Sequence, residues 1–300
     1  WYVSLADNDV KDNEVIKADP LPSIKLPSDD EVISELAEPY HLTNDQIDFF
    51  KKNGFIKLKK VFTPGAVLKL RAELINLLSK EFKVNPDKGA FDRFLSLEMV
   101  WPDNALIRAY VLSPRLGKIS ADLLEVTAVR LYHDNVLAKQ AGCGRTPWHF
   151  DDHHFPLDTN DVVTAWAPAQ PIPVEMGPLT FAYPLDVHKL VNTVTFEKTG
   201  TGYDRGVSDV FLKNNVSVNE TPFEMGEVSF HHNLNFHSAP RNRTNRSRVA
   251  LANTYYRDGA RVVNAPTMVS GDWQKFMPNV KPGDVAASPL NPICWPVKDK

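Results

Sequence analysis

The chain has 300 residues, 43% of them hydrophobic and 24% charged, which is ordinary for a globular enzyme that buries a sizeable core. Its 34 basic and 37 acidic residues give a formal net charge of -3, which excludes strong attraction to nucleic acid or to an anionic membrane. Two cysteines are too few for a disulfide framework, although one bridge between them stays open, and no apolar run reaches the roughly 20 residues of a membrane-spanning helix. We therefore expect a soluble, cytoplasmic protein.

The N-terminal stretch, residues 1–39, is rich in acidic residues and proline and shows no steady hydrophobic period. Such composition is typical of a loose arm. We expect this arm to lie against the body of the protein or against a second copy of the chain.

Residues 40–125 show the patterns of helices. Thr43 opens the spacing of a capping box and Gly54 follows the apolar positions, which predicts a short helix before a strand at 55–58. Longer helices are predicted where a serine or threonine precedes proline, because proline suits the first helical position. These starts are at Thr63-Pro64 and at Ser113-Pro114.

From residue 126 onward the chain consists of short segments rich in β-branched and aromatic residues, separated by turn residues. The predicted strands are 129–132, 136–139, 148–151, 162–166, 179–183, 227–230 and 248–256. Short strands with this spacing favour a sandwich or barrel over an alternating α/β sheet. We predict a mainly β protein with flanking helices, in which a jelly roll at 126–260 and a tail at 261–300 belong to a single domain of residues 40–300.

Two segments lie outside the strand pattern. Residues 193–223 are polar and contain glycines, and a connection of this length is either a lid or a mobile insertion. The tail from residue 261 is rich in proline. We expect this tail to wrap the body of the domain.

A His-x-Asp triplet, His149 and Asp151, carries the chemistry of the chain. In a strand, side chains two residues apart point to the same side, so both can approach one ion. Two histidines and one carboxylate leave coordination positions open, which is the arrangement of non-haem Fe(II) oxygenases. The best candidate for the second histidine is His237; His231 and His232 compete with it and are interpreted as hydrogen-bonding residues of the rim or core.

An arginine follows the distal histidine, and its planar fork of donors suits a carboxylate better than the point charge of a lysine. Arg248 is the favoured candidate, because the small residues Ala250 and Ala252 share its face of the predicted strand and leave room beside the metal. Other arginines of the same run compete with it and are expected in a solvated turn: Arg241, Arg243 and Arg246.

Taken in order, these motifs resemble the phytanoyl-CoA dioxygenase-like family of Fe(II)/2-oxoglutarate oxygenases over residues 42–260. The segments that carry the resemblance are 147–151, 164–166, 177–181 and 237–248. The resemblance implies a double-stranded β-helix, also called a cupin-like jelly roll. In that fold His149, Asp151 and His237 would hold Fe(II) and carry catalysis, with 2-oxoglutarate and O2 as cosubstrates.

The resemblance also implies contacts to the cosubstrate. Arg248 would pair with the distal carboxylate of 2-oxoglutarate, while Trp166 and Asn135 match residues that line the cosubstrate pocket in relatives. Some relatives carry a serine where this chain has Ala239. Ser238, one position earlier, is therefore a further candidate, with its contact shifted or lost.

Substrate contacts are expected from residues that follow the metal-binding segment or that the resemblance places near the pocket. These are His153, His154, Trp101 and Arg93, and each has an equally good structural explanation. Histidines and an arginine suit a polar or anionic group, whereas the neighbouring aromatic residues suit an apolar skeleton. Halogenating relatives replace the carboxylate ligand by a small residue, so the presence of Asp151 favours hydroxylation or a related oxidation.

The hypothesis is a dioxygenase that oxidises an unactivated C–H bond of a small metabolite or natural product, with succinate and carbon dioxide as co-products. One alternative is an acyl-CoA hydroxylase of the same family, against which stands the lack of a broad basic patch. A zinc-dependent hydrolase would need a further general acid or base and has no use for Arg248. A non-catalytic cupin-like binding protein would lack a ligand. We expect a small-molecule partner, neither nucleic acid nor membrane, and a monomer or homodimer.

Overall fold

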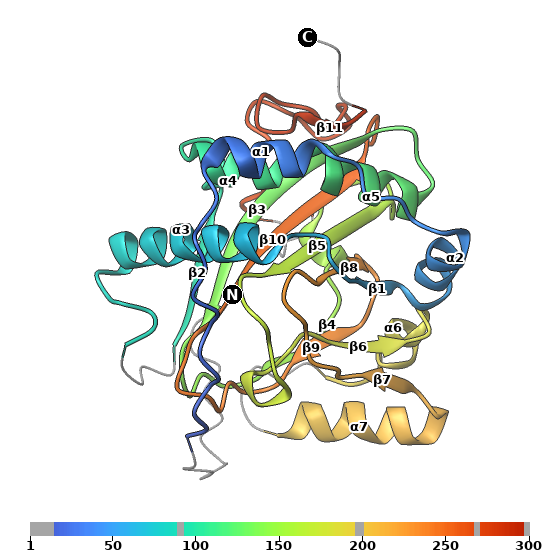
Figure 1. Ribbon diagram of the computed structural model, residues 1–300. Helices are drawn as coiled ribbons and strands as arrows, with labels where there is room; N and C mark the ends of the chain where they lie inside the picture. The colour runs from blue at the N-terminus through green and yellow to red at the C-terminus, as the bar shows by residue number, and fades with distance from the viewer. Residues whose placement is uncertain (1–14, 89–92, 196–200, 267–270, 297–300) are drawn as a thin grey trace.

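The fold consists of two antiparallel sheets: helices of the N-terminal part pack on the large sheet, and a further helix, residues 202–214, lies beside the small sheet (Figure 1). A computed structural model describes residues 15–88, 93–195, 201–266 and 271–296. The strands of the large sheet are β1 (Phe55–Leu58), β2 (Phe94–Glu98), β3 (Val129–Lys139), β5 (Val162–Pro168), β8 (Val228–His232), β10 (Arg248–Arg257) and β11 (Ile293–Trp295). The strands of the small sheet are β4 (Thr146–His149), β6 (Thr180–Tyr183), β7 (Ser217–Asn219) and β9 (His237–Ala239).

Strands that are distant in sequence are neighbours in both sheets. The large sheet has the order β1-β8-β5-β10-β3-β11, with β2 also paired to β3, and the small sheet has the order β4-β9-β6-β7. All of these pairs are antiparallel, and β10 lies between β3 and β5 along most of its length. This is the double-stranded β-helix, or jelly roll. The predicted mainly β fold with flanking helices is confirmed.

The N-terminal part supplies helices α1 (Asp29–Ala37), α2 (Asn44–Asn53), α3 (Pro64–Phe82), α4 (Ala105–Val111) and α5 (Pro114–Leu124). The predicted starts of α2, α3 and α5 are confirmed, because Thr43, Thr63 and Ser113 each accept a hydrogen bond from the N–H three residues on. Gly54 ends α2 with a φ of 75°, a conformation that a residue without a Cβ adopts at little cost.

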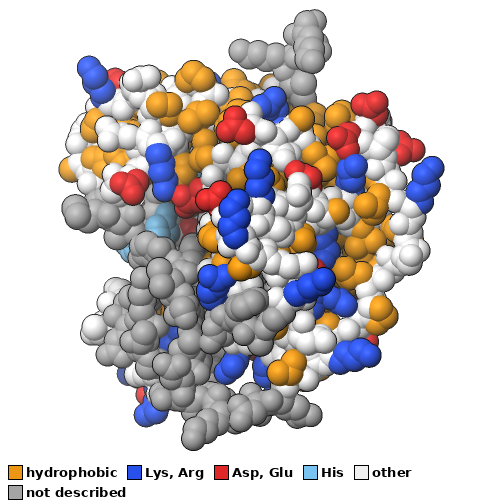
Figure 2. All heavy atoms as spheres, turned by 90° about the vertical axis from the view of Figure 1, so that its left-hand side faces the viewer, with side chains coloured by type: hydrophobic (Ala, Val, Ile, Leu, Met, Phe, Trp, Pro, Cys, Tyr) orange, Lys and Arg blue, Asp and Glu red, His pale blue; other side chains and the backbone are white. Residues whose placement is uncertain are grey.

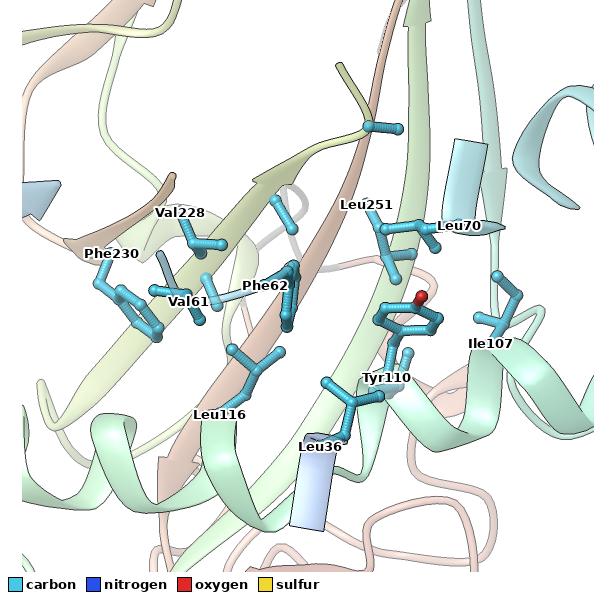
Figure 3. Close-up of a cluster of buried hydrophobic side chains, with 14 of the residues drawn as sticks. Leu36, Val61, Phe62, Leu70, Ile107, Tyr110, Leu116, Val228, Phe230 and Leu251 are labelled. Atoms are coloured by element: carbon cyan, nitrogen blue, oxygen red, sulfur yellow. The ribbon is translucent and has the colours of Figure 1, made fainter. Parts of the chain in front are cut away.

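These helices cover the outer face of the large sheet and enclose the main hydrophobic core (Figure 3). The core combines side chains from the helices with side chains from β8 and β10: Leu36, Leu70, Ile107, Tyr110, Leu116, Val228, Phe230 and Leu251. Burial of each large apolar side chain contributes about 1.5–3 kcal/mol. The hydroxyl of Tyr110 donates to the carbonyl of Ala66 at 2.7 Å, so its burial leaves no unmet donor. The helix-facing side of the sheet is therefore filled by these side chains.

Two predicted strands, 129–132 and 136–139, are one strand of 11 residues, β3. The polar residues between them suggested a turn, but their side chains have partners inside the protein. Asp134 accepts the backbone N–H of Val100 at 3.1 Å, and Asn135 accepts the hydroxyl of Ser96 at 2.9 Å. The separation into two strands was wrong because these buried polar residues continue the ladder.

The described part of the N-terminal arm, residues 15–39, lies against the body and contains regular structure. Its helix α1 begins with a capping box of Ser28 and Glu31, and Val32 and Leu36 are buried in the main core. Residues 1–14 lie outside the described residues.

The 193–223 segment also contains regular structure, namely helix α7 (Gly202–Asn214) and strand β7, while residues 196–200 lie outside the described part. The remaining short elements are α6 (Val187–Leu190), η1 (Asp152–His154), η2 (Val174–Met176) and η4 (Trp273–Lys275). Cys143 and Cys294 are both buried and neither is in a disulfide, so the bridge that the sequence left open is not formed. Among the described residues, no helix has both the length and the apolar character required to cross a bilayer.

Candidate active site

The small sheet brings two histidines together. His149, at the end of β4, is the ladder partner of His237 in β9, and their ring centroids are 4.2 Å apart. Asp151 follows two residues after His149. One ligand atom from each of the three side chains lies within 4.8 Å of the other two, so the structure unites the predicted set around a single point.

Asp151 reaches this point from a turn. The predicted strand 148–151 ends at His149, and Asp151 has the helical backbone angles φ -89° and ψ -12° just before η1. The ladder stops here because the N–H groups of Asp151 and Asp152 both donate to the carbonyl of Asn233, at 2.8 and 3.1 Å. The carboxylate still lies beside the histidine, with Asp151 Oδ1 3.6 Å from His149 Nε2.

Backbone carbonyls fix the orientation of both histidine rings. Nδ1 of His149 lies 2.8 Å from the carbonyl of Pro147, and Nδ1 of His237 lies 3.0 Å from the carbonyl of Asn235. A carbonyl only accepts, so each Nδ1 carries the proton and each Nε2 presents its lone pair toward the shared point. Such an arrangement is usual for histidines that bind a metal through Nε2.

The charges of the cluster suit a divalent cation. Burial by itself would raise the pKa of Asp151, but the imidazoles of His237, His231 and His149 outweigh it and hold that pKa below its ordinary value. Burial lowers the pKa of His237 well below its ordinary value, so its imidazole is neutral at pH 7. Neutral imidazole nitrogens and one carboxylate are the donor set of a first-row divalent metal, so these residues fit Fe(II).

A pocket of about 920 Å³ opens beside this cluster, lined by residues of both sheets. Arg248 lines it and is 2% exposed; its Nη1 donates to the carbonyl of Gly177 at 2.7 Å, and its guanidinium lies 5.2 Å from the ring centre of Trp166. On the face shown in Figure 2, histidine is visible in a recess beside acidic side chains. A buried guanidinium and a three-residue metal site therefore share one cavity.

Comparisons with known proteins place this arrangement in a family. The family model described as phytanoyl-CoA dioxygenase (PhyH) matches residues 50–250, which is most of the chain. The chain belongs to the phytanoyl-CoA dioxygenase family. It is a 2-oxoglutarate-dependent dioxygenase that uses Fe(II), 2-oxoglutarate and O2.

Curated relatives and solved structures agree with this assignment. The peroxisomal phytanoyl-CoA dioxygenase of Mus musculus is 25% identical over 232 residues, which are 70% of this chain and 67% of that protein. The enzyme of the same name from Bos taurus is 24% identical over 245 residues, covering 72% and 71%. The fold is similar to that of the non-haem α-ketoglutarate-dependent carbocyclase SnoK from nogalamycin biosynthesis, with a TM-score of 0.68, 23% identity, and coverage of 85% of this chain and 99% of that one. It is also similar to EctD from S. alaskensis with bound Fe, with a TM-score of 0.60, 15% identity, and coverage of 87% and 89%.

The other predicted cosubstrate residues of this dioxygenase lie in two different places. Trp166 and Asn135 line the pocket, from β5 and β3. Ser238 is buried but is not among the described lining residues, whereas its neighbours His237 and Ala239 are. Side chains alternate along a strand, so Ser238 points away from the cavity that His237 faces.

Of the predicted substrate residues, the structure places His154 alone at the described pocket wall. His153 is exposed and its ring packs on Phe150 at a centroid distance of 4.6 Å. Trp101 is buried in the helix-side core, where the carboxylate of Asp134 holds the adjoining backbone. Arg93 is exposed and its Nε lies 3.4 Å from the side chain of Gln140. These three residues have structural environments outside the cavity.

Sequence reasoning missed several lining residues. His133, Thr164 and Thr254 line the pocket from strands of the large sheet, as does His231, which the sequence had offered only as a competing ligand or a hydrogen-bonding residue. Each lies two residues from another lining residue or inward-facing position of its strand, so the period of two is the signal that would have found them. Another group of lining residues comes from irregular chain near the C-terminus, for which no periodic signal exists: Gly271, Asp272, Trp273, Lys275 and Phe276.

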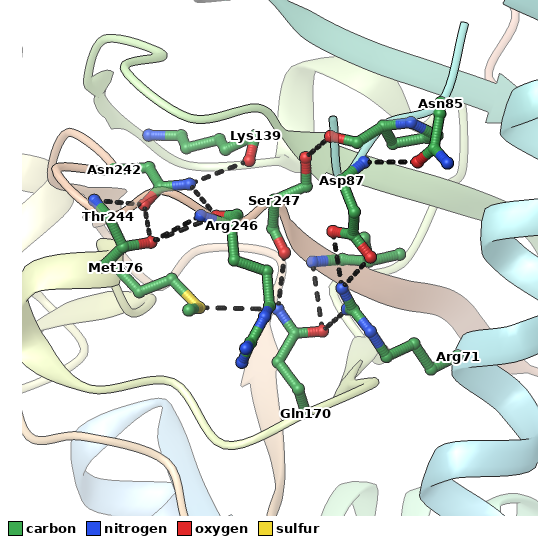
Figure 4. Close-up of polar contacts among 12 residues, drawn as sticks. Arg71, Asn85, Asp87, Lys139, Gln170, Met176, Asn242, Thr244, Arg246 and Ser247 are labelled. Carbon is green, nitrogen blue, oxygen red and sulfur yellow. Dashed lines mark hydrogen bonds and ion pairs between the residues drawn. The ribbon is translucent and has the colours of Figure 1, made fainter. Parts of the chain in front are cut away.

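The loop between β9 and β10 sets the start of the arginine strand (Figure 4). At its centre the buried Asn242 donates from Nδ2 to the carbonyls of Lys139 and Arg246, at 3.1 and 2.8 Å, and accepts from the backbone N–H of Thr244. Gln170 donates to the carbonyl of Ser247 at 3.0 Å. These bonds fix the chain up to the residue before Arg248, so the direction of the guanidinium is set by the scaffold.

Helix α7 supports the strand that carries His149. The hydroxyl of Tyr203 donates to the carbonyl of Trp148 at 2.8 Å, and the ring of Phe211 meets the indole of Trp148 edge-on at a centroid distance of 5.1 Å. No described residue of α7 is among those that line the pocket. Within the described residues, the segment therefore buttresses the metal strand and does not form a lid.

Proposed function

We propose that this dioxygenase hydroxylates, or otherwise oxidises, an unactivated C–H bond of a small metabolite or natural product. One oxygen atom of O2 would enter the substrate as a hydroxyl group and the other would enter succinate, with carbon dioxide leaving as the second co-product. The observation that carries the proposal is the cavity shared by the histidine–aspartate cluster and Arg248.

In this proposal His149, Asp151 and His237 hold Fe(II). When bound, Fe(II), 2-oxoglutarate and O2 together supply the oxidising power for attack on a C–H bond. Arg248 binds the distal carboxylate of 2-oxoglutarate with its planar fork of donors, in a site where 2% exposure leaves little competition from water. Trp166 supports the guanidinium through its ring face.

The remaining task of the chain is to place the substrate and to exclude water, because a misplaced substrate wastes the oxidant. Small Ala252 leaves space on the inner face of β10, and Asn135 offers a polar contact beside it. On the pocket wall, His154 supplies a polar group whose pKa burial lowers below its ordinary value, so the ring is neutral at pH 7 and can donate or accept a hydrogen bond.

The walls of the cavity favour a compact, largely apolar substrate. Tyr132 packs against Phe155 and Phe276 at centroid distances of 5.0 and 5.3 Å, and all three line the pocket. Lys275 also lines it but is paired with Glu98 at 2.7 Å. A skeleton of one or a few rings with few charges would fill this space against the aromatic faces.

An acyl-CoA hydroxylase is the second candidate, since the curated relatives are named phytanoyl-CoA dioxygenase. A CoA group carries several phosphate charges and would need several cationic partners. Among the described lining residues the cationic side chains are Arg248, which the proposal gives to 2-oxoglutarate, and the paired Lys275. The small-molecule reading is therefore favoured.

The test follows succinate formation by metal-free protein supplied with Fe(II), ascorbate and 2-oxoglutarate, with and without a panel of ring-containing metabolites and acyl-CoA thioesters. Succinate formation stimulated by a panel member, with the matching hydroxylated product, is expected. Asp151→Ala and His237→Ala should abolish succinate formation, whereas Ser238→Ala should retain it, because the side chain of Ser238 points away from the cavity. Stimulation by acyl-CoA thioesters alone would favour the second candidate, and hydrolysis supported by Zn(II) alone would refute the oxygenase.

A further inference from the structure

A third histidine, His231 of β8, touches the metal site without belonging to it. The residue is 3% exposed, its Nε2 lies 3.3 Å from Asp151 Oδ2, and its ring centroid lies 4.4 Å from that of His237. Among the described residues, the set whose ligand atoms can share one ion contains His149, Asp151 and His237 but not His231. Its position calls for a role different from that of the proposed ligands.

The two oxygens of Asp151 face different partners. Oδ1 lies 3.6 Å from Nε2 of His149 and 3.9 Å from Nε2 of His237. Oδ2 lies on the side of His231. A metal held between Nε2 of His149 and Nε2 of His237 would therefore meet Oδ1, while Oδ2 is already occupied by an imidazole.

The surroundings of His231 determine which of its nitrogens carries the proton. Its Nδ1 is buried and has no hydrogen-bond partner among the described residues, so a proton there would be an unmet buried donor. A proton on Nε2 instead faces Asp151 Oδ2 at 3.3 Å, where the carboxylate can accept it. The Nε2–H form is thus the one that the site stabilises, and it makes His231 a donor to the carboxylate.

We propose that His231 is a positioning residue that holds Oδ2 and makes Asp151 bind the metal through Oδ1 alone. The proposal rests on the metal site of the proposed function. A carboxylate that bound through both oxygens would occupy an additional coordination position. With His231 in place, the protein would supply three ligand atoms, and the other coordination positions of the metal would stay open for 2-oxoglutarate and O2.

The sheet gives His231 the rigidity that this role requires. It is the ladder partner of Phe55 in β1 and of Thr164 in β5, so its backbone is fixed on both sides. The next residue, His232, points to the opposite face, where its Nδ1 accepts the N–H of Leu234 at 3.2 Å. His232 is therefore a matched control, because it is a histidine on the same strand without contact to the site.

The test titrates metal-free protein with Co(II) and records both the dissociation constant and the visible absorption of the bound ion, which reports its coordination number. His231→Leu is expected to raise the dissociation constant by about 10–100-fold, the usual effect of removing a partner of a ligand, and to change the spectrum. His231→Gln, whose amide N–H can donate in the same direction, should restore most of the affinity. His232→Leu should match wild type, and the thermal unfolding of the metal-free proteins shows whether each is folded.

Each outcome decides between the alternatives. Unchanged Co(II) affinity and spectrum in folded His231→Leu would overturn the inference, as would complete loss of binding equal to that of His237→Ala, since this would make His231 a direct ligand. If His231→Leu does not fold, His231→Asn provides the same comparison with His231→Gln, because its amide is too short to reach Oδ2. Failure of wild type to bind Co(II) would instead refute the metal site itself.

Discussion

Replacement of Arg248 by methionine tests the assignment of the cosubstrate end of the pocket. Methionine keeps an unbranched side chain of similar length but removes the charge and the donors. The guanidinium is 2% exposed, so its contact with a carboxylate would be largely shielded from solvent. Truncation of one partner of such a buried, hydrogen-bonded charge pair typically costs about 2–5 kcal/mol. Arg248→Met should therefore weaken 2-oxoglutarate binding by about 30-fold to several thousand-fold, at 1.4 kcal/mol for each factor of ten.

The same reasoning predicts a graded series. Arg248→Lys keeps the charge but not the fork, and it loses the stacking of the guanidinium on Trp166, so its affinity should lie between those of wild type and Arg248→Met. Arg243 is an exposed arginine of the loop before β10 that is not among the described lining residues. Arg243→Met is thus the control, with affinity expected to equal that of wild type.

The assay is calorimetric titration of 2-oxoglutarate into the Mn(II)-loaded protein without oxygen, so that binding is measured apart from turnover. Thermal unfolding of each variant checks that the fold survives. An affinity of Arg248→Met within threefold of wild type would refute the pairing of Arg248 with the cosubstrate. The same loss in Arg243→Met would also refute it, because the effect would then come from general charge and not from a directed contact.

Three further predictions concern stability and specificity. Burial raises the pKa of Asp134 to about 6 from 3.8, so its stabilising contribution is complete below the lower value and is lost as pH rises through the upper one. Urea unfolding should show the free energy of unfolding of wild type, relative to that of Asp134→Asn, falling by about 2 kcal/mol between pH 4 and 7, and a constant difference would contradict this. Gly177 has a φ of 73°, and a Cβ there would lie 2.3 Å from the carbonyl oxygen of Pro240, so Gly177→Ala should lower the free energy of unfolding in urea by about 1–3 kcal/mol. It should also weaken 2-oxoglutarate binding, because the carbonyl of Gly177 accepts a hydrogen bond from Arg248. Phe276→Ala removes part of the aromatic wall and enlarges the pocket, so it should change which panel members stimulate succinate formation while 2-oxoglutarate affinity stays the same. An unchanged substrate profile would show that Phe276 does not contact the substrate.

The sequence predicted best what depends on local chemistry. A serine or threonine before proline identified the starts of α3 and α5, and the capping box at Thr43 identified α2. His149, Asp151 and His237 could be proposed from the sequence because their residue types and their order along the chain do not depend on the turn that joins them. The structure brings these three side chains together even though Asp151 lies in a turn and not in the strand.

Predictions failed where a tertiary partner decides the outcome. The polar residues within β3 suggested a break, because nothing local indicates that Asp134 accepts the N–H of Val100, far away in sequence. Trp101 was a candidate for substrate contact, yet its side chain belongs to the helix-side core. Residues near a motif in sequence can thus lie on the wrong face of a sheet, and only the register shows which face.

Two parts of the cavity wall are built by different means, and this bears on how specificity is set. Around the metal cluster and Arg248, the side chains come from paired strands such as β9 and β10, whose positions are fixed by ladders and by the Asn242 loop. Another part of the wall includes η4 and Phe276, which lie beyond the 50–250 span of the family match and make no ladder pairs among the described residues. Substitutions in η4 can therefore reshape the substrate space with little effect on the geometry around Asp151 or Arg248. In this architecture the identity of the oxidised molecule is separable from the chemistry that oxidises it.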